Sequence, residues 1–474
     1  MNQQFIGSRA IGRDGLVFNF MKSEILDQVL PSRIHSIDFI SNYFTREDSL
    51  CELPPIIVNH IGYVRKINFS RQTSFKDFNQ LDLFTNLEEF KISDTRLPAE
   101  NVIRILSSNK HLKSIEYSNP LCDSSTLDVQ LFLASIISLP NLRHVNLSGV
   151  KFINDEIVAK LLINLPYLSD LVVRYCTNVS DIAFAGIEQH KHIKIVDITG
   201  CKITNPGIIL KNQNIRKLSY EDSDFENVYL DLGTIVSKVI ELSFSLSTNI
   251  STNVLRSIAD SCPDVEILRL ETSTYKSDGL KQFLNSSINK LTSLKELYLN
   301  GTKLDDGNIK EILLEKLQIL SLEFNNITDS SIDKIKQFTQ LTDIRLGRTN
   351  ITHKGIADLL AHYHSIGKVI ENLALNSLKI TGEQILSIPH WSQVQRLNLS
   401  KNKVNNDAFL FLIKLLNIIE LNCSDNMITN EAVHPHIYSN RTLRKLNLSS
   451  NRNISARTKS SIVMKCPNIS ELTL

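Results

Sequence analysis

One short pattern of apolar residues recurs from end to end of this chain. An apolar residue is followed by two variable residues, a second apolar residue, one variable residue and a third apolar residue. The clearest copies are LRHVNL, LKELYL, LTDIRL, VQRLNL and LRKLNL. A chain of 474 residues would otherwise suggest about three separate domains. A pattern repeated at short, near-constant intervals instead predicts one repetitive architecture built from stacked units.

Seventeen copies can be placed in register, at intervals of 22 to 30 residues. An eighteenth, weaker copy, IHSIDF, begins at Ile34. The first apolar residues of the seventeen are Val64, Leu87, Leu112, Leu142, Leu168, Ile193, Ile215, Val239, Val265, Leu294, Leu317, Leu341, Ile370, Val394, Ile418, Leu443 and Ile469.

The spacing within each copy predicts its local structure. Alternation of apolar and variable residues fits a short strand with one buried face, and stacked copies make a parallel sheet. Stretches between the strands, such as DEIVAKLLINL, SSIDKIKQFTQ and NDAFLFLIKLL, carry apolar residues at helical spacing. The expected fold class is therefore α/β, a solenoid (horseshoe) with parallel strands on the concave face and helices on the convex face.

The third residue after the last apolar residue of a copy, here called the loop position, is usually small and polar. We expect its side chain to turn inward and bond backbone groups that the loop leaves unpaired. In segments such as NITDSSI and NITHKGI, the Asp, Thr or Asn that follows can cap the next helix. The loop position holds Cys176, Cys201, Thr302, Thr349, Asn325, Asn402, Asn426 and Asn451.

These motifs, with CPDV, CPNI, LPNL or LPYL before the strand, resemble the cysteine-containing and ribonuclease-inhibitor-like leucine-rich repeats. Similar repeats occur in F-box leucine-rich repeat proteins and in bacterial leucine-rich repeat effectors. The resemblance spans 34–474 and implies a leucine-rich repeat domain of about 17 to 18 repeats. It implies a protein-binding scaffold without naming the partner.

Residues 1–33 do not follow the repeat. Met21, Ile25, Leu26 and Val29 share one helical face, which predicts an N-terminal helical cap over the first repeat. A second interpretation of residues 30–50 is a degenerate F-box, because LPSRIHSIDFISNYFTREDSL approaches that helical motif. At the other end, ISELTL closes the last copy, which predicts self-association through an uncapped strand or a cover from another chain.

Composition narrows the function classes. Fifty-two Lys and Arg against fifty Asp and Glu give a formal charge of +2, which disfavours nucleic acid as the partner. The sequence has neither an apolar run of membrane-spanning length nor a secretory signal, so we expect a cytoplasmic protein. We find no catalytic or phosphate-binding motif and expect no enzyme activity and no cofactor.

Neither cysteine nor histidine predicts a metal site. The seven cysteines are scattered and include no CxxC pair, which predicts buried free thiols rather than disulfides, zinc ligands or a nucleophile. Three HxH pairs lack neighbouring Cys or clustered carboxylates, so we expect no bound metal there. The pairs are His190/His192, His362/His364 and His434/His436.

The register predicts which residues face outward from the strands. Most copies carry small polar residues there, but the central copies carry aromatic and charged ones, which dominate protein interfaces. An alternative is mutual pairing of Arg with Glu on a plain solvated surface. The predicted partner-binding residues on the concave face are Arg174, Tyr175, Arg269, Glu271, Tyr298, Glu323, Phe324, Arg345 and Arg348.

The sequence therefore favours a non-enzymatic scaffold that binds a protein partner. The Lys-, Ile- and Asn-rich composition suggests an AT-rich genome and extends the hypothesis to a secreted bacterial effector in host cytosol. One alternative is the substrate receptor of a ubiquitin ligase, which requires the F-box. A minor alternative is a GTPase activator, which rests only on the resemblance to an activator built from similar repeats.

Overall fold

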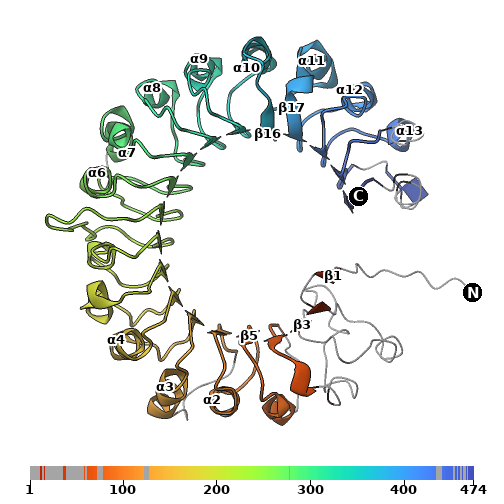
Figure 1. Cartoon of the computed structure of the whole chain (residues 1–474). Helices are drawn as coiled ribbons and strands as arrows, with labels where there is room; N and C mark the ends of the chain where they lie inside the picture. Colours follow the sequence, from red (N-terminus) through yellow and green to blue (C-terminus); the bar gives the residue numbers. More distant parts are fainter. Residues whose placement is uncertain are drawn as a thin grey trace, which may run out of the picture. The chain divides into compact units, whose positions relative to one another are not determined.

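A computed structural model describes most of the repeats. It describes residues 61–71, 78–121, 128–276, 278–433 and 440–451, together with the short pieces 11–12, 15–16, 36–38, 58, 454–455, 457–458, 462, 466 and 468–473. The chain divides into two compact units (Figure 1). Unit 1 comprises Met1–Ser223 and Asn227–Val239, and unit 2 comprises Asp224–Glu226 and Ile240–Leu474.

In unit 1 the strands β3 to β10 pair in parallel, each with the next along the chain. An antiparallel pair, β1 (Ile11–Gly12) and β2 (Gly15–Leu16), precedes them. The parallel strands are β3 (Ser36–Asp38), β4 (Lys66–Asn68), β5 (Glu89–Ser93), β6 (Ser114–Ser118), β7 (His144–Asn146), β8 (Asp170–Val172), β9 (Ile195–Asp197) and β10 (Lys217–Ser219).

Helices and short 3-10 turns join these strands. They are η3 (Ile61–Tyr63), η4 (Phe78–Leu83), α2 (Ala99–Ser108), α3 (Val129–Ile137), α4 (Asp155–Asn164), η5 (Asp181–Phe184), η6 (Ile187–Gln189) and α5 (Gly207–Leu210). Between β10 and β11 no helix forms, so the expected convex helix is missing from that repeat.

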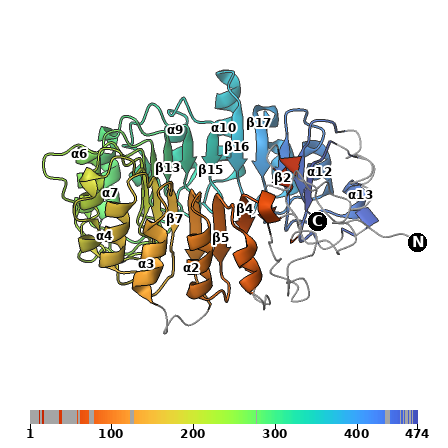
Figure 2. The same cartoon turned by 60° about the horizontal axis from the view of Figure 1, so that its bottom comes forward.

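Unit 2 continues the same plan with β11 to β20, again parallel and consecutive (Figure 2). The strands are β11 (Glu241–Ser243), β12 (Ile267–Arg269), β13 (Glu296–Tyr298), β14 (Ile319–Ser321), β15 (Asp343–Arg345), β16 (Ile370–Ala374), β17 (Val394–Asn398), β18 (Glu420–Asn422), β19 (Lys445–Asn447) and β20 (Glu471–Thr473).

Within unit 2 the strands line the inner side of the arc and the helices lie on its outer side (Figure 1). The outer segments are α6 (Thr252–Ser261), α7 (Gly279–Asn285), η7 (Ser287–Lys290), α8 (Asp306–Ile309), η8 (Asp329–Ser331), α9 (Ile332–Ile335), α10 (His353–Ser365), α11 (Gly382–Ser387), η9 (Trp391–Gln393), α12 (Asn406–Leu412) and α13 (Asn430–Val433).

Each of the seventeen copies carries one strand, β4 to β20, so the predicted parallel repeat sheet is confirmed. The apolar residues of the repeat form the core. Leu317, Leu320 and Leu322, for example, are each 0% exposed. Because one copy buries its apolar face only against its neighbours, the core is continuous along each unit.

The residues of the predicted N-terminal helix, Met21 to Val29, lie outside the described residues. Ser36–Asp38, within the segment with two interpretations, is strand β3 and pairs in register with β4. Strand is the structure expected of a repeat at Ile34. The rest of residues 30–50 lies outside the described residues.

Bonding by side chains at the loop position is confirmed in both units. In unit 1, Cys176 and Cys201 donate through Sγ to the carbonyls of Leu147 (3.3 Å) and Val173 (3.1 Å). In unit 2, Asn325 donates to the carbonyl of Leu299 (2.8 Å), and its Oδ1 accepts from the backbone N–H of Leu304 (2.9 Å). Each contact joins one repeat to the preceding one.

The helix caps are those that the sequence predicts, and an aspartate beside them makes a further contact between repeats. Thr328 and Thr352 cap η8 and α10 through their hydroxyls. The aspartate after such a cap bonds the next repeat instead of capping its own helix. Asp329 accepts from the backbone N–H (2.8 Å) and hydroxyl (2.6 Å) of Thr352, and Asp181 makes the equivalent contacts with Thr204. These carboxylates couple neighbouring repeats.

Candidate functional site: an aromatic and charged face in unit 2

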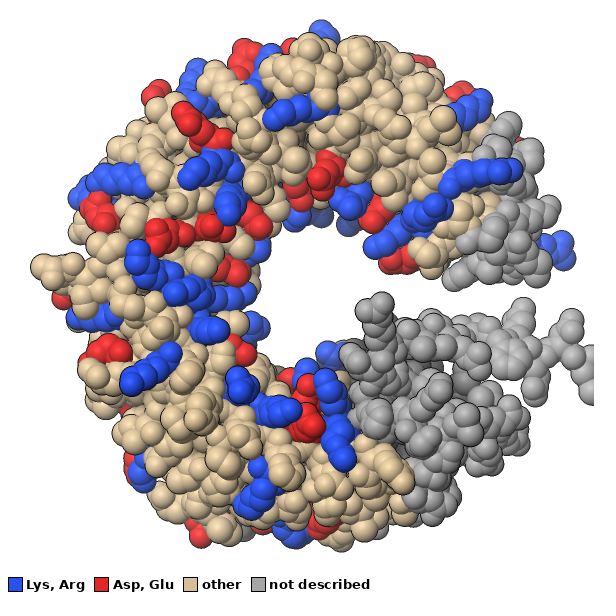
Figure 3. All heavy atoms as spheres, in the orientation of Figure 1, with Lys and Arg blue, Asp and Glu red and all other residues tan. Residues whose placement is uncertain are grey.

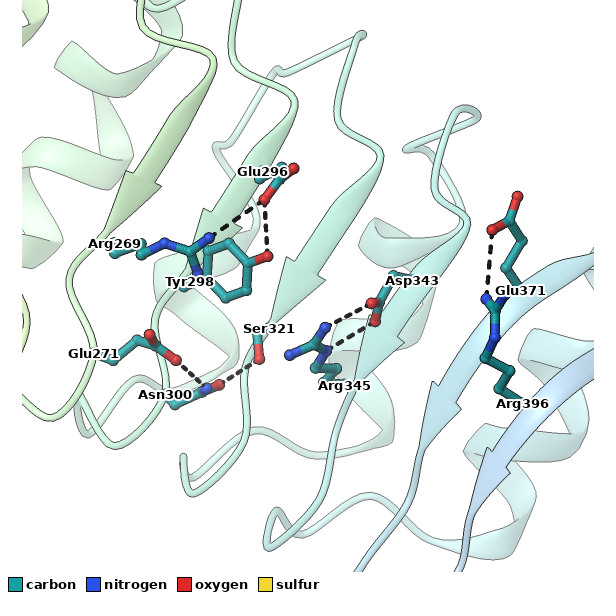
Figure 4. Close-up of polar contacts among 10 residues, drawn as sticks. All are labelled: Arg269, Glu271, Glu296, Tyr298, Asn300, Ser321, Asp343, Arg345, Glu371 and Arg396. Atoms are coloured by element: carbon teal, nitrogen blue, oxygen red, sulfur yellow. Dashed lines mark hydrogen bonds and ion pairs between the residues drawn. The ribbon is translucent and has the colours of Figure 1, made fainter. Parts of the chain in front are cut away.

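Three of the predicted site residues meet on neighbouring strands of unit 2. Arg269, Tyr298 and Arg345 occupy equivalent positions of β12, β13 and β15, and Ser321 of β14 lies between the last two. The guanidinium carbon of Arg269 lies 3.9 Å from the centre of the Tyr298 ring, and that of Arg345 lies 5.7 Å from it (Figure 4). Two guanidinium groups therefore share one phenol ring, an arrangement favoured by the quadrupole of the ring.

Tyr298 is less accessible than its register predicts. It is only 6% exposed, because Arg269 lies across its ring. Its hydroxyl donates to Oε2 of Glu296 at 2.8 Å. Burial, followed by this hydrogen bond, raises the pKa of Tyr298, so the hydroxyl stays protonated at neutral pH. The Tyr298 ring is therefore the surface against which the guanidinium groups of Arg269 and Arg345 lie.

Carboxylates hold both arginines in place. Asp343 accepts from Nε (3.0 Å) and Nη2 (2.7 Å) of Arg345, a bidentate pair that raises the pKa of Arg345. Arg269 lies between Glu241 (3.5 Å) and Glu296 (3.7 Å). The alternative interpretation, in which the arginines pair with neighbouring carboxylates, is therefore partly correct. The pairing also orients the guanidinium planes on the face, where side chains of both signs lie close together (Figure 3).

The residue directly after the last apolar residue of a copy, here called the post-strand position, extends the face. Glu271 accepts from the Asn300 amide at 2.5 Å, and Asn300 accepts from the hydroxyl of Ser321 (2.7 Å) and the backbone N–H of Glu323 (2.9 Å). Burial raises the pKa of Glu323, which also bonds Asn376. No Lys, Arg or His of the described chain lies within ion-pair distance of Glu271 or Glu323.

The residue after the post-strand position has a left-handed backbone in nearly every repeat. Glycine or asparagine tolerates this conformation best, and other residues cost about 1 kcal/mol. Phe324 (φ 58°) and Arg348 (φ 54°) occupy it in unit 2, and the Arg348 guanidinium lies 5.6 Å from the Phe324 ring centre. Phe324 is 62% exposed. Because residues such as Thr272 and Lys401 share this conformation, it is the exposure of the Phe324 ring that distinguishes this position from the others.

Arg174 and Tyr175 lie in unit 1, so we describe them separately from the unit 2 face. Arg174 pairs with Asp197 at 2.6 Å. Tyr175 also has a left-handed backbone (φ 56°), and its hydroxyl donates to Asp222 at 3.1 Å. Gly200 leaves room for its ring, because a Cβ there would come within 2.5 Å of the ring.

One residue was missed by the sequence reasoning. Leu246 of unit 2 has the same left-handed conformation (φ 59°) and is 53% exposed. The signal was available, because the register places it two residues after Phe244. Its identity alone is a weak signal, because an isolated exposed leucine is common on protein surfaces.

The cysteines behave as buried structural residues. Cys176, Cys201, Cys262, Cys423 and Cys466 are free and buried, while Cys51 and Cys122 lie outside the described residues. Burial raises the pKa of Cys176 to about 11 and those of Cys201 and Cys262 to about 12. These thiols are protonated at neutral pH and are poor nucleophiles.

The described histidines of the HxH pairs each contact a protein group, although Nε2 of His362 is buried without a hydrogen-bond partner in the described structure. His190 is buried and contacts the carbonyl of Leu165 (3.0 Å), and His192 packs on Tyr167. His364 stacks on His390 with ring centres 3.9 Å apart, whereas His362 contacts Tyr363. Among the residues that the structure describes, no three metal-ligating side chains cluster, and no helix is long and apolar enough to span a bilayer. The third pair, His434 and His436, lies outside the described residues.

Comparison with known proteins gives the class. The family described as Leucine Rich repeat matches residues 189–210, 314–336 and 439–457. With the repeated strands, this makes the chain a leucine-rich repeat protein whose fold is an α/β leucine-rich repeat solenoid. No curated protein matches the sequence.

Solved structures show a likeness of fold alone. The complex of TLR13 with ssRNA13 has 14% identity and a TM-score of 0.49, over 93% of this chain and 71% of that chain. The mouse RP105/MD-1 complex has 15% identity and a TM-score of 0.42, over 84% and 80%. A leucine-rich repeat protein of Leptospira interrogans has 16% identity and a TM-score of 0.40, over 96% and 99%.

Proposed function

We propose that this protein is a non-enzymatic scaffold that binds a protein partner through the face formed by β12 to β15. The observation that carries the proposal is the stack of Arg269 and Arg345 on Tyr298, held by Glu296 and Asp343. Side chains already fixed in one geometry lose little conformational entropy when a partner binds. Arg and Tyr are also the residues that most often contribute binding energy at interfaces.

The proposed contact residues in unit 2 share one face. Phe324 provides exposed apolar area at its edge, and Arg348 lies beside it. Arg174 and Tyr175 are proposed as a separate contact on unit 1. The unit 2 residues are Arg269, Glu271, Tyr298, Glu323, Phe324, Arg345 and Arg348.

We further propose that the partner is met in a reducing compartment, either the cytoplasm of the producing cell or the cytosol of a host. The support is that the five described cysteines are all free. Free thiols are typical of cytosolic proteins.

Capture from cytosolic extract, followed by mass spectrometry, tests the proposal. Arg345→Ala and Phe324→Ala should each remove the partner that the wild type captures. Matched controls are Arg256→Ala on the outer helix α6 and Leu313→Ala after α8, both exposed positions. Loss with the control variants, or retention with Arg345→Ala combined with Phe324→Ala, would place the contact elsewhere.

No observation of this kind favours the ubiquitin-ligase alternative, because β3 accounts for 36–38 as a repeat strand. The same capture experiment covers it. Capture of a ubiquitin-ligase adaptor that disappears on deletion of residues 1–50 would support an F-box.

A further inference from the structure

The outward surface of β11 to β16 carries an excess of acidic groups. Here we call this surface the β11–β16 face and define it as the strand residues of these repeats together with the post-strand residues. Its cations are Arg269 and Arg345. Its carboxylates are Glu241, Glu271, Glu296, Glu323, Asp343 and Glu371, the last of which pairs with Arg396 of β17 at 3.7 Å.

The same positions elsewhere are nearly balanced. On β17 to β20 of unit 2, Arg396 and Lys445 face Glu420 and Glu471 at 3.2 to 3.7 Å. On β4 to β10 of unit 1, four cations oppose five carboxylates; they are Lys66, Lys91, Arg174 and Lys217 against Glu89, Glu116, Asp170, Asp197 and Glu221. The acidic excess is therefore a local property of the β11–β16 face.

The ion pairs within the β11–β16 face do not include all of its carboxylates. Arg269 is shared by Glu241 and Glu296, and Arg345 is taken by Asp343. Glu271 accepts from the Asn300 amide (Figure 4). Glu323, two strands away on the same row, accepts from the Asn376 amide, and neither carboxylate makes an ion pair within the described structure. Arg345 lies near enough to lower the pKa of Glu323, but burial, which raises that pKa, is the larger effect. A partly buried carboxylate without a cation is unfavourable, and a cation supplied from outside would relieve that cost.

A side-chain amide and an exposed ring lie next to Glu323. The post-strand residue of the next repeat is Gly347, and the amide of Asn376 fills the space beside it, because a Cβ at Gly347 would come within 2.3 Å of the amide oxygen of Asn376. That oxygen is buried and has no hydrogen-bond partner in the described structure. Phe324 projects beside the same row and is 62% exposed. A guanidinium or ammonium group that pairs with Glu323 would lie beside one exposed aromatic ring.

We propose that the β11–β16 face binds a basic segment of the protein partner, with Arg or Lys side chains seated at Glu271 and Glu323. This inference rests on the proposed function, because it names the chemistry of the partner at the same site. Charge complementarity of this kind sets the specificity and the rate of association. Nucleic acid does not fit, because its phosphates would meet a surface with surplus carboxylates.

The size of the face sets the length of the probe. Six strands about 4.8 Å apart span roughly 24 Å, which an extended peptide covers in about eight residues. The probe is a fluorescein-labelled peptide of about ten residues that alternates Arg and Ser, compared with its Glu and Ser counterpart. Fluorescence anisotropy measures binding to the full chain at low and at high salt.

We expect the basic peptide to bind the wild type, and to bind less tightly as salt rises. Glu271→Gln combined with Glu323→Gln keeps the shape of both side chains but removes their charge, and should weaken binding at least about tenfold. The charge-matched control is Glu315→Gln with Glu383→Gln, two exposed glutamates outside the face. A urea midpoint equal to that of the wild type would show that each variant is folded.

Three results would overturn the inference: no binding of the basic peptide, tighter binding of the acidic peptide, or equal binding by the Glu271/Glu323 variant. None of these decides the proposed function, which is judged by partner capture with the Arg345 and Phe324 variants. If those variants lose the partner while the Glu271/Glu323 variant keeps it, the scaffold proposal stands and the basic segment is wrong.

Discussion

The two units fill the same inward loop position with different chemistry. In unit 1, the thiol of Cys201 makes one hydrogen bond, to the carbonyl of Val173. In unit 2, Asn402 donates to Leu375 (2.9 Å) and Leu399 (3.0 Å) and accepts from two backbone N–H groups, those of Leu378 and Ile380. The comparison shows that the loop position accepts two kinds of side chain. One is a small thiol with a single hydrogen bond, and the other is an amide that bonds several backbone groups.

The largest expected effect lies in unit 2. Asn402→Ala leaves two buried carbonyls and two backbone N–H groups without their partner, so we expect a loss of about 3 kcal/mol in the free energy of unfolding. Urea denaturation measures it. If the free energy of unfolding falls by less than about 1 kcal/mol, water replaces the amide in the variant, and the proposed difference between the two units is wrong.

The matched change in unit 1 should cost less. Cys201→Ala removes one weak hydrogen bond and little volume, and we expect a loss of about 1 kcal/mol. Hydrogen exchange of the amides in 193–220 locates the effect within unit 1. If Cys201→Ala proves as damaging as Asn402→Ala, the two residues are equivalent despite their different contacts.

The inter-repeat aspartates should not distinguish the units. Asp181 in unit 1 and Asp329 in unit 2 make equivalent contacts with the next repeat's threonine. Asp→Asn at either site keeps the shape but weakens a charge-assisted bond, and we expect about 0.5 to 1 kcal/mol from each in urea denaturation. Unequal losses would show that the strength of this contact depends on the repeat in which it lies.

The smallest effect concerns pH, and its sign differs between the units. Burial raises the pKa of Glu323 in unit 2, so its contribution to stability is present at low pH and is lost as pH rises through the raised pKa. The hydrogen bond from Lys113 lowers the pKa of Glu88 in unit 1, so that contribution is present at neutral pH and is lost as pH falls.

Urea midpoints of Glu323→Gln and Glu88→Gln at about pH 4 and about pH 7 check the two signs. Relative to the wild type, Glu323→Gln should gain at the higher pH and Glu88→Gln should lose there. The same direction for both variants would contradict the assigned causes.

The sequence predicted much of this architecture because the repeat leaves few choices. The interval between copies placed each strand, and the alternation of apolar residues placed Leu317, Leu320 and Leu322 inside. The inward turn of Asn325 and Cys176 could be predicted because a loop with unpaired backbone groups needs a partner nearby. The missing helix between β10 and β11 departs from the expectation of one helix per repeat, although the segment before Val239 already lacks helical periodicity in its apolar residues.

The site was predicted only in part. The register placed Arg269, Tyr298 and Arg345 within four consecutive strands, and they lie at equivalent positions of β12, β13 and β15. The covering of Tyr298 depends on which way Arg269 turns, and that direction is set by Glu241 and Glu296 on the strands either side. The direction of the Arg269 side chain depends on residues from three repeats, so it can be known only when the spacing of those repeats in the structure is known.

By itself, then, the sequence determined the class of fold, the strand of each repeat and which side chains point inward, because these depend on periodicity within a single copy. Only the tertiary structure decided which outward charges form ion pairs and which, like those of Glu271 and Glu323, do not. The physical reason is that ion pairs form across strands about 4.8 Å apart, between residues that are separated by a whole repeat in the chain.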